Sequence, residues 1–163
     1  MIHLSTDYVF DGTKSEPYTE DDPPRPINVY GRSKLAGELA IQAAGAPYMI
    51  FRTNWVYGLR EGNLLLTILR LAKERDELRI VGDQIGAPTW SRTYAEVSAL
   101  ALARGRAMGI EQFNGIYHLT AGGGDFLVWL CASDCSIRVI LAVMKPTPAF
   151  DHFLHWFQCR ATT

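Results

Sequence analysis

Three residues in the first part of the chain could together reduce a carbonyl group. Thr6 follows a short apolar run at residues 2–5, and Tyr30 and Lys34 lie four positions apart. Positions i and i+4 lie on one face of a helix, so Tyr30 and Lys34 can point the same way, and Thr6 can join them from the end of a neighbouring strand. An ammonium group beside a phenol stabilises the phenolate, which makes the phenol a better proton donor. A carbonyl oxygen held by Thr6 and Tyr30 could therefore accept a proton while the carbonyl carbon accepts a hydride.

The rest of the chain predicts elements that can position these residues. Short apolar runs alternate with amphipathic stretches, which is the pattern of an α/β domain built on a mostly parallel sheet. Residues 14–26 contain four prolines and four carboxylates and are expected to form a surface loop. Asn28 can cap the helix that carries Tyr30 and Lys34. Strands are expected at residues 2–5, 47–53, 78–81 and 115–119, and helices at residues 28–43, 63–75 and 94–104.

The bulk composition narrows the class of protein. The chain has 163 residues, of which 48% are hydrophobic and 20% charged, as in an ordinary globular domain. A net charge of −1 gives no electrostatic reason to expect a nucleic acid or a membrane as a partner. No apolar stretch is long enough to span a bilayer, and no signal peptide opens the chain. Three cysteines, all in the last third, argue against a disulfide framework, so we expect a cytoplasmic protein.

Four sequence blocks connect the catalytic pattern to a known family. They are residues 5–12 (STDYVFDG), 28–38 (NVYGRSKLAGE), 52–58 (RTNWVYG) and 83–90 (DQIGAPTW). Together they resemble the dTDP-4-dehydrorhamnose reductase family of extended short-chain dehydrogenases, from about residue 2 to residue 123. A lone Tyr-x-x-x-Lys motif is a weak signal, whereas four blocks in the family's order and spacing are specific.

The resemblance implies a fold, a reaction and a cofactor. The expected fold is a partial Rossmann-like, doubly wound parallel sheet, comprising the C-terminal half of the dinucleotide domain and a substrate-binding part. The implied reaction is the reduction of dTDP-4-dehydro-β-L-rhamnose to dTDP-β-L-rhamnose with NADPH or NADH. A dTDP-sugar is therefore the expected partner, and a homodimer is expected for the full-length family. The sequence offers no ligand motif for a Mg²⁺ ion, so that requirement stays open.

The same resemblance assigns roles to individual residues, and each has a simpler alternative. Thr6 orients the carbonyl, with Ser5 as its nearest rival, although a hydroxyl residue after a strand more often makes a turn or a cap. Trp55 could stack on a ligand or belong to the core, and Arg92 could bind a diphosphate or be a surface residue. The assigned sets are Thr6, Tyr30 and Lys34 for catalysis; Tyr30, Lys34, Thr53 and Asn54 for the cofactor; and Asp7, Trp55, Gln84, Thr89 and Arg92 for the substrate.

The sequence also leaves alternatives to the reductase. A non-catalytic binding homologue, such as the regulatory subunit of methionine adenosyltransferase, shares this fold and would also retain Thr6, Tyr30 and Lys34. The loop at residues 84–89 and the complete triad favour the reductase. Nucleotide-sugar epimerases and dehydratases are weaker candidates, because they usually lack the run at residues 6–10 beside that at residues 55–58.

Both ends of the sequence depart from the family pattern. The glycine-rich turn that binds a dinucleotide pyrophosphate does not precede Ser5, so we expect residues 1–124 to be a partial reductase domain without turnover by itself. Residues 125–163 form a divergent, irregular tail. One permitted coding of residues 125–134, read one base later, restores a family-like helix start, which suggests a frameshift near Gly124. The spacing of Cys131, Cys135, His152 and His155 could suggest zinc, but no turn chemistry supports it, and no metal site is predicted.

Overall fold

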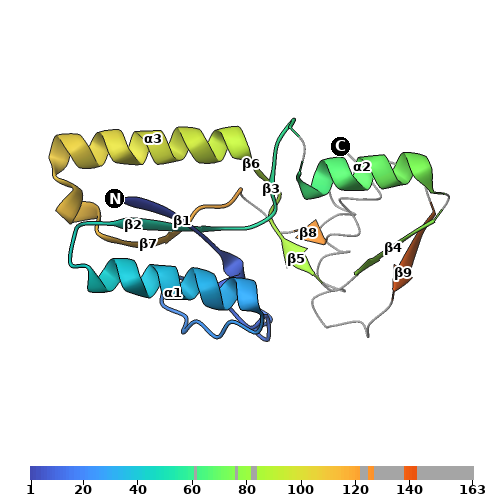
Figure 1. The fold of residues 1–163 in the computed structure, drawn as a ribbon, viewed down its shortest axis with the longest axis horizontal. Coiled ribbons are helices and arrows are strands. Elements are labelled where there is room, and N and C mark those ends of the chain that lie inside the picture. Colours follow the sequence, from blue (N-terminus) through green and yellow to red (C-terminus); the bar gives the residue numbers. More distant parts are fainter. Residues whose placement is uncertain (61, 76, 82–83, 122–124, 127–137, 143–163) are drawn as a thin grey trace, which may run out of the picture. The chain divides into compact units, whose positions relative to one another are not determined.

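The computed structural model describes residues 1–60, 62–75, 77–81, 84–121, 125–126 and 138–142. They belong to two compact units, the first comprising Met1–Asn63 and Ala87–Gly123, and the second Leu64–Gly86 and Gly124–Thr163. Each unit contains both helix and strand (Figure 1), which confirms the α/β class predicted from the sequence.

A three-stranded parallel sheet forms the centre of the first unit. Its strands are β1 (Ile2–Thr6), β2 (Met49–Thr53) and β7 (Gly115–His118), with β2 in the middle. Both strand pairs are parallel, so the carboxyl ends of all three strands lie at one edge of the sheet. The register places Thr6 beside Thr53. The predicted catalytic hydroxyl and a predicted cofactor-binding residue therefore lie on neighbouring strand ends.

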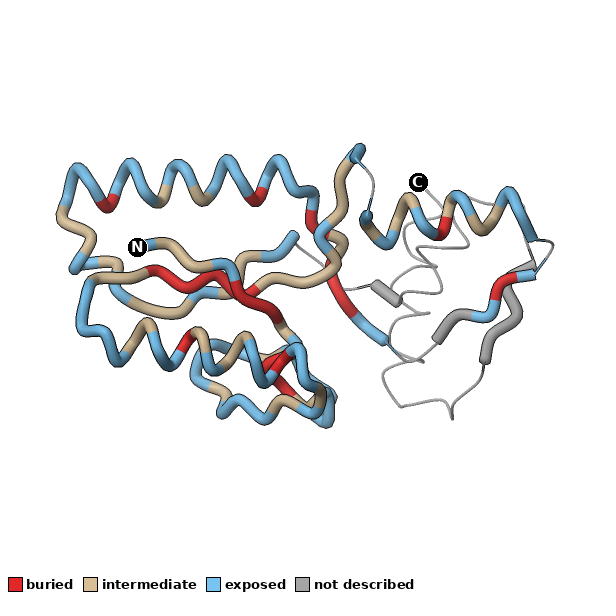
Figure 2. The backbone as a smooth tube through the Cα atoms, viewed as in Figure 1, coloured by how far each residue is buried: buried red, intermediate tan, exposed pale blue. Residues whose placement is uncertain are grey.

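One helix covers each face of this sheet. Helix α1 (Val29–Ala43) lies on one side and α3 (Ser91–Met108) on the other (Figure 1). Successive side chains of a strand point to opposite faces. Along β2, Met49 and Phe51 join Tyr94 of α3 in a buried apolar cluster, whereas Arg52 pairs with Glu38 of α1. Figure 2 shows β2 as a continuous buried segment between the two helices.

Local sequence signals explain where the two helices begin and end. The Asn28 side chain accepts a hydrogen bond from the Gly31 N–H at 2.7 Å, which confirms the predicted cap of α1. Helix α3 is longer than the predicted range of 94–104, because it starts directly after a short strand and continues to Met108. It ends at Gly109, whose φ of 91° is a backbone conformation that favours glycine.

Several short elements connect the main ones in the first unit. A 3-10 turn, η1 (Asp7–Val9), follows β1, and a second, η2 (Ile110–Phe113), follows α3. Strands β3 (Val56–Tyr57) and β6 (Thr89–Trp90) pair in parallel. This pairing brings the segment after β2 next to the segment before α3.

The second unit has one described helix and two strand pairs. Helix α2 (Leu64–Glu74) was predicted from its apolar periodicity, and its Ile68 is buried. Strand β4 (Glu77–Val81) pairs in parallel with β9 (Arg138–Ala142). Strand β5 (Ile85–Gly86) pairs antiparallel with β8 (Asp125–Phe126).

The proposed tail at residues 125–163 falls mostly outside the described residues. The division of the chain at residue 124, the frameshift hypothesis and the rejection of a zinc site at the cysteines and histidines therefore stay predictions. Among the described residues, no cluster of three or more His, Cys, Asp or Glu side chains could hold a metal ion. None of the described helices has the length and apolar character needed to cross a membrane.

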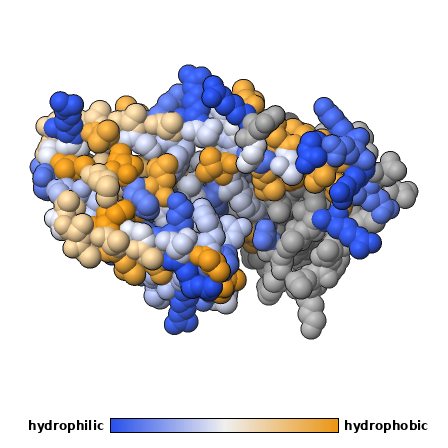
Figure 3. Space-filling model, viewed as in Figure 1, coloured by the Kyte–Doolittle hydropathy of each residue, from blue (hydrophilic) through white to orange (hydrophobic). Residues whose placement is uncertain are grey.

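Hydrophobic side chains also reach the surface of the first unit. β1 is an edge strand of its sheet and exposes Leu4, and the outer faces of the helices expose Leu39 and Leu100. Figure 3 shows such hydrophobic atoms in orange on the visible face of this unit. Helix α1 buries few apolar side chains, because its buried residues are Gly31 and Glu38.

Candidate active site

The predicted proton donor and its neighbouring cation lie on one face of α1. The Lys34 Nζ atom is 6.0 Å from the centre of the Tyr30 ring, and it donates a hydrogen bond to the Leu4 carbonyl of β1 at 3.1 Å. Tyr30 is 51% exposed. No hydrogen bond engages its hydroxyl among the described residues, so the phenol is free to meet a ligand.

A glycine allows α1 to approach the segment after β1 very closely. A Cβ atom at Gly31 would lie 2.0 Å from the Tyr8 carbonyl oxygen, a distance that no side chain can occupy. The contact brings the Tyr8 and Tyr30 rings edge to face, with centroids 5.9 Å apart. Sequence reasoning did not select Tyr8, because an aromatic residue in a turn gives no signal that distinguishes it from a core residue.

The predicted carbonyl-orienting residue already has partners in this structure. The Thr6 hydroxyl donates to Asp7 Oδ1 at 3.1 Å and accepts the Tyr8 N–H at 3.3 Å. The Asn54 side chain also lies near Asp7, where it acts to lower the pKa of the carboxyl group, and its Oδ1 accepts the Ala87 N–H at 3.4 Å. A carbonyl oxygen that accepted the Thr6 hydrogen would have to replace the Asp7 carboxylate as its acceptor.

The Asp7 carboxyl group is unusual because it is largely withdrawn from solvent. Burial raises the pKa of Asp7 above its ordinary value, while hydrogen bonds from Thr6 and Asn54 act in the opposite direction. Asp7 lies directly after β1 and Asn54 directly after β2, so the parallel register brings the two side chains together. The result is a polar cluster at the carboxyl edge of the sheet.

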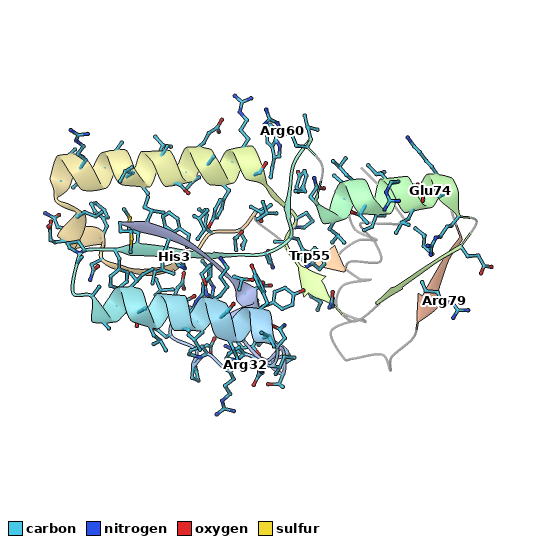
Figure 4. All side chains as sticks on the ribbon, in the orientation of Figure 1. His3, Arg32, Trp55, Arg60, Glu74 and Arg79 are labelled. Atoms are coloured by element: carbon cyan, nitrogen blue, oxygen red, sulfur yellow. The ribbon has the colours of Figure 1, made fainter. Side chains whose placement is uncertain are left out.

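Two further predicted residues lie at the same edge, Thr53 as the last residue of β2 and Trp55 just beyond it. The Thr53 hydroxyl is buried and has no hydrogen-bond partner among the described residues. Trp55 lies just beyond β2 (Figure 4) and has a φ of 38°, in the left-handed region that residues other than glycine seldom adopt. Its carbonyl accepts the Thr89 N–H at 3.2 Å. That bond connects the strained residue to β6.

Three predicted substrate residues lie outside this cluster. The Thr89 hydroxyl is buried, donates to the Ala87 carbonyl at 2.9 Å and accepts the Ala121 N–H at 3.2 Å. Arg92 is exposed on α3, where it pairs with Glu96 at 2.8 Å. Gln84 is exposed and belongs to the second unit. Their substrate roles stay predictions.

A buried ion pair behind the site was not predicted from the sequence. The guanidinium of Arg52 binds the carboxylate of Glu38 through two nitrogen atoms, and the Ser5 hydroxyl donates to the same carboxylate. One signal could have revealed it, since Glu38 lies four residues after Lys34 and therefore on the helix face of the predicted pair.

Comparisons with known proteins identify the family of this chain. The family model described as RmlD substrate binding domain matches residues 1–133. The dTDP-4-dehydrorhamnose reductase of Burkholderia thailandensis is 56% identical over 126 residues, which are 76% of this chain and 42% of that protein. The chain thus spans about two fifths of the length of the curated relatives it matches.

Solved structures show the same fold. A dTDP-4-dehydrorhamnose reductase from Clostridium acetobutylicum superposes with a TM-score of 0.77 at 33% identity, covering 90% of this chain and 52% of that one. A second, from Bacillus anthracis in complex with NADP, superposes with a TM-score of 0.72 at 32% identity, covering 91% and 54%. The chain therefore belongs to the RmlD substrate binding domain family, as its resemblance to the dTDP-4-dehydrorhamnose reductases predicted.

Proposed function

We propose that this chain carries the proton-donating part of a dTDP-4-dehydrorhamnose reductase, which reduces the 4-keto group of dTDP-4-dehydro-β-L-rhamnose. The observation that carries the proposal is the exposed Tyr30 phenol, which has Lys34 beside it and lies where α1 meets the segment after β1. A carbonyl reduction requires an accessible proton donor, and a cation close to a phenol stabilises the phenolate that forms.

Each residue has a distinct part in the proposed reaction. Tyr30 donates its proton to the carbonyl oxygen, and the ammonium of Lys34 stabilises the phenolate that remains. Thr6 turns its hydroxyl from Asp7 towards the carbonyl oxygen and orients it. Asp7 is then free to accept a hydrogen bond from a sugar hydroxyl, in keeping with its assignment to the substrate. Trp55 offers a ring face for stacking at the same edge of the sheet.

The residues at this edge fit a nicotinamide cofactor. The buried Thr53 hydroxyl lacks a partner among the described residues, and the Lys34 ammonium uses one of its three donors on Leu4. These groups, with Tyr30 and Asn54, would hold the nicotinamide ribose. NADPH, when bound, would supply the hydride for the carbonyl carbon.

The experiment uses a chimera, because the chain spans only part of the length of its relatives. The 126 aligned residues of the Burkholderia thailandensis reductase are replaced with the matching residues of this chain. Oxidation of NADPH with dTDP-4-dehydrorhamnose is then followed by absorbance. We expect turnover, and we expect Tyr30→Phe to lower kcat by about 10²–10⁴-fold, the usual contribution of a general acid.

Lys34→Met provides a second, independent readout in the same chimera. It should shift the pH–rate profile and weaken NADPH binding together, because one side chain serves both the phenol and the cofactor. A chimera that binds NADPH and the sugar but never turns over would exclude the reductase and favour a binding protein. Near-normal turnover by the Tyr30→Phe chimera would assign the proton donor elsewhere.

A further inference from the structure

The best-defined polar interaction in the first unit is a buried cluster of Ser5, Glu38 and Arg52. Arg52 donates to Glu38 from Nε at 3.1 Å and from Nη2 at 2.7 Å, and the Ser5 hydroxyl donates to Glu38 Oε1. Glu38 is 1% exposed and Arg52 3% exposed. A two-point guanidinium–carboxylate contact fixes orientation as well as distance. The cluster therefore constrains the three elements that supply its members, namely β1, α1 and β2.

Each member of the cluster is close in the sequence to a residue of the proposed site. Ser5 precedes Thr6, and Arg52 precedes Thr53. Glu38 lies one helical turn after Lys34, on the face that also carries Tyr30. Any rotation or shift of α1 that disturbed the Glu38 contacts would move Tyr30 and Lys34 with it.

Apolar packing alone constrains the position of α1 only weakly. Its buried residues are Gly31 and Glu38, whereas Leu35 and Ile41 are half-buried and Leu39 is 56% exposed. A shift by one residue moves a helix by about 1.5 Å along its axis and rotates it by about 100°. Such a shift would break both guanidinium bonds. The Glu38 carboxylate thus makes the buried directional contacts between this helix and the sheet, alongside the exposed hydrogen bond from Lys34 Nζ to the Leu4 carbonyl.

Arg52 extends the constraint to the turn after β1. The Arg52 guanidinium lies 5.1 Å from the centre of the Phe10 ring, and Phe10 directly follows η1. The segment that carries Thr6 and Tyr8 is therefore held by Arg52 at one end and by Ser5 at the other. The buried cluster therefore joins the elements that carry the two sides of the proposed proton-transfer geometry, α1 with Tyr30 and β1 with Thr6.

We propose that Ser5, Glu38 and Arg52 are positioning residues that hold Tyr30 and Lys34 in register with Thr6. The proposal rests on the proposed reductase function for its kinetic consequences, whereas its structural consequence can be measured without it. A buried ion pair is weak evidence for stability, since an apolar pair of similar volume is often as stable. The double variant Glu38→Leu/Arg52→Met therefore separates positioning from stability.

The structural test uses the full chain with ¹³C-labelled tyrosine. The readout is the NOE between the Tyr8 and Tyr30 rings, assigned with Tyr30→Phe, and amide exchange of β2 reports the fold. In the double variant we expect protected β2 amides but loss of the Tyr8–Tyr30 cross-peak. Glu96→Gln, which breaks an exposed ion pair in the same unit, is the control and should leave the cross-peak intact.

Either result of this experiment is decisive. A folded double variant that keeps the Tyr8–Tyr30 cross-peak overturns the proposal. If the double variant does not fold, Ser5→Ala takes its place, because it removes one hydrogen bond and keeps the ion pair. We then expect the Tyr30 ring resonances to shift, and unchanged Tyr30 resonances in Ser5→Ala would likewise overturn the proposal.

The kinetic test uses the chimera described above. A misplacement of about 1 Å can cost about 10²-fold in rate, so Glu38→Leu/Arg52→Met should lower kcat by that order. Residues that act through Tyr30 lose their effect once its hydroxyl is removed. We therefore expect no further loss when the double change is added to Tyr30→Phe, and a full additional loss would contradict positioning. A chimera that is inactive before any substitution refutes the reductase function and leaves the NMR result to decide this proposal.

Discussion

The two helices that cover the sheet are attached to it in different ways. On the α3 side, Met49 and Phe51 pack against Tyr94 in an apolar cluster, joined by partly buried residues such as Ile110. On the α1 side, a row of polar residues crosses the three strands. The register places Ser5 beside Arg52 and Arg52 beside His118.

The difference follows from what each helix must do. Apolar packing is non-directional and tolerates small shifts, which suffices for a helix that only covers a sheet. Hydrogen bonds to a buried carboxylate require one geometry, and the helix attached in this way carries Tyr30 and Lys34. The polar row gives α1 a defined position, whereas the α3 side contributes mainly apolar burial, together with the hydrogen bond that the Tyr94 hydroxyl donates to the Phe51 carbonyl at 3.2 Å.

The largest effect should come from breaking the buried ion pair on the α1 side. Arg52→Met leaves the Glu38 carboxylate buried without its cation, which typically costs about 3–5 kcal/mol of unfolding free energy. Native-state hydrogen exchange of the β2 amides in the full chain measures this loss. Arg92→Met breaks an exposed pair on α3 and should cost less than about 1 kcal/mol. Equal losses for the two variants would remove the distinction between the faces.

A second prediction compares conservative substitutions on the two faces. Arg52→Lys keeps the charge but cannot reproduce the two-point contact, so we expect a loss of about 2–3 kcal/mol. Met49→Leu keeps the volume of a buried apolar side chain and should cost less than about 1.5 kcal/mol. The same exchange measurement compares them. If Met49→Leu lowered the free energy of unfolding more than Arg52→Lys, the apolar face would be the one that tolerates conservative substitutions less.

A third prediction compares two helical glycines, Gly31 of α1, which faces Tyr8, and Gly105 of α3, which faces Ile110. A Cβ at Gly31 would lie 2.0 Å from the Tyr8 carbonyl oxygen, so Gly31→Ala must displace α1 and should destabilise by about 1–3 kcal/mol. A Cβ at Gly105 would meet Ile110 at 3.4 Å, an ordinary contact. Gly105→Ala should therefore stabilise α3 by up to about 1 kcal/mol. Thermal unfolding of both variants tests the opposite signs, and two effects of the same sign would count against this account.

The smallest effect concerns pH and the Asp7 carboxyl. Burial raises the pKa of Asp7 above 3.8, so between that value and its folded pKa the folded chain binds more protons than the unfolded chain. Folding is therefore favoured most when Asp7 is protonated. The free energy of unfolding falls as pH rises from 3.8 through the folded pKa of Asp7. Asp7→Asn should flatten this dependence and make the chain slightly more stable at pH 7. Urea unfolding of both proteins across that pH range is the measurement, and identical pH profiles would show that Asp7 is not the group responsible.

The local structure of this chain was largely predictable. Continuous apolar runs identified β1 and β2, helical periodicity identified α2, and Asn28 identified the start of α1, because these signals depend on neighbours in the sequence. The Tyr30–Lys34 pair was also readable, since residues four apart on a helix must share a face. The ends of α3 were not, because a helix continues for as long as the backbone allows, here until Gly109.

Only the tertiary structure decided which residues meet across elements. Sequence spacing could not bring Glu38, Arg52 and Ser5 together, because these contacts depend on the order β1–β2–β7 and on the side of the sheet that α1 covers. The same holds for the Thr6–Asp7–Asn54 cluster, in which parallel register joins two strand ends that are about fifty residues apart in the chain. The sequence by itself determined the chemical groups and the elements that carry them. Their mutual positions depend on the packed fold, in which a buried charge such as that of Glu38 is stable only with a partner.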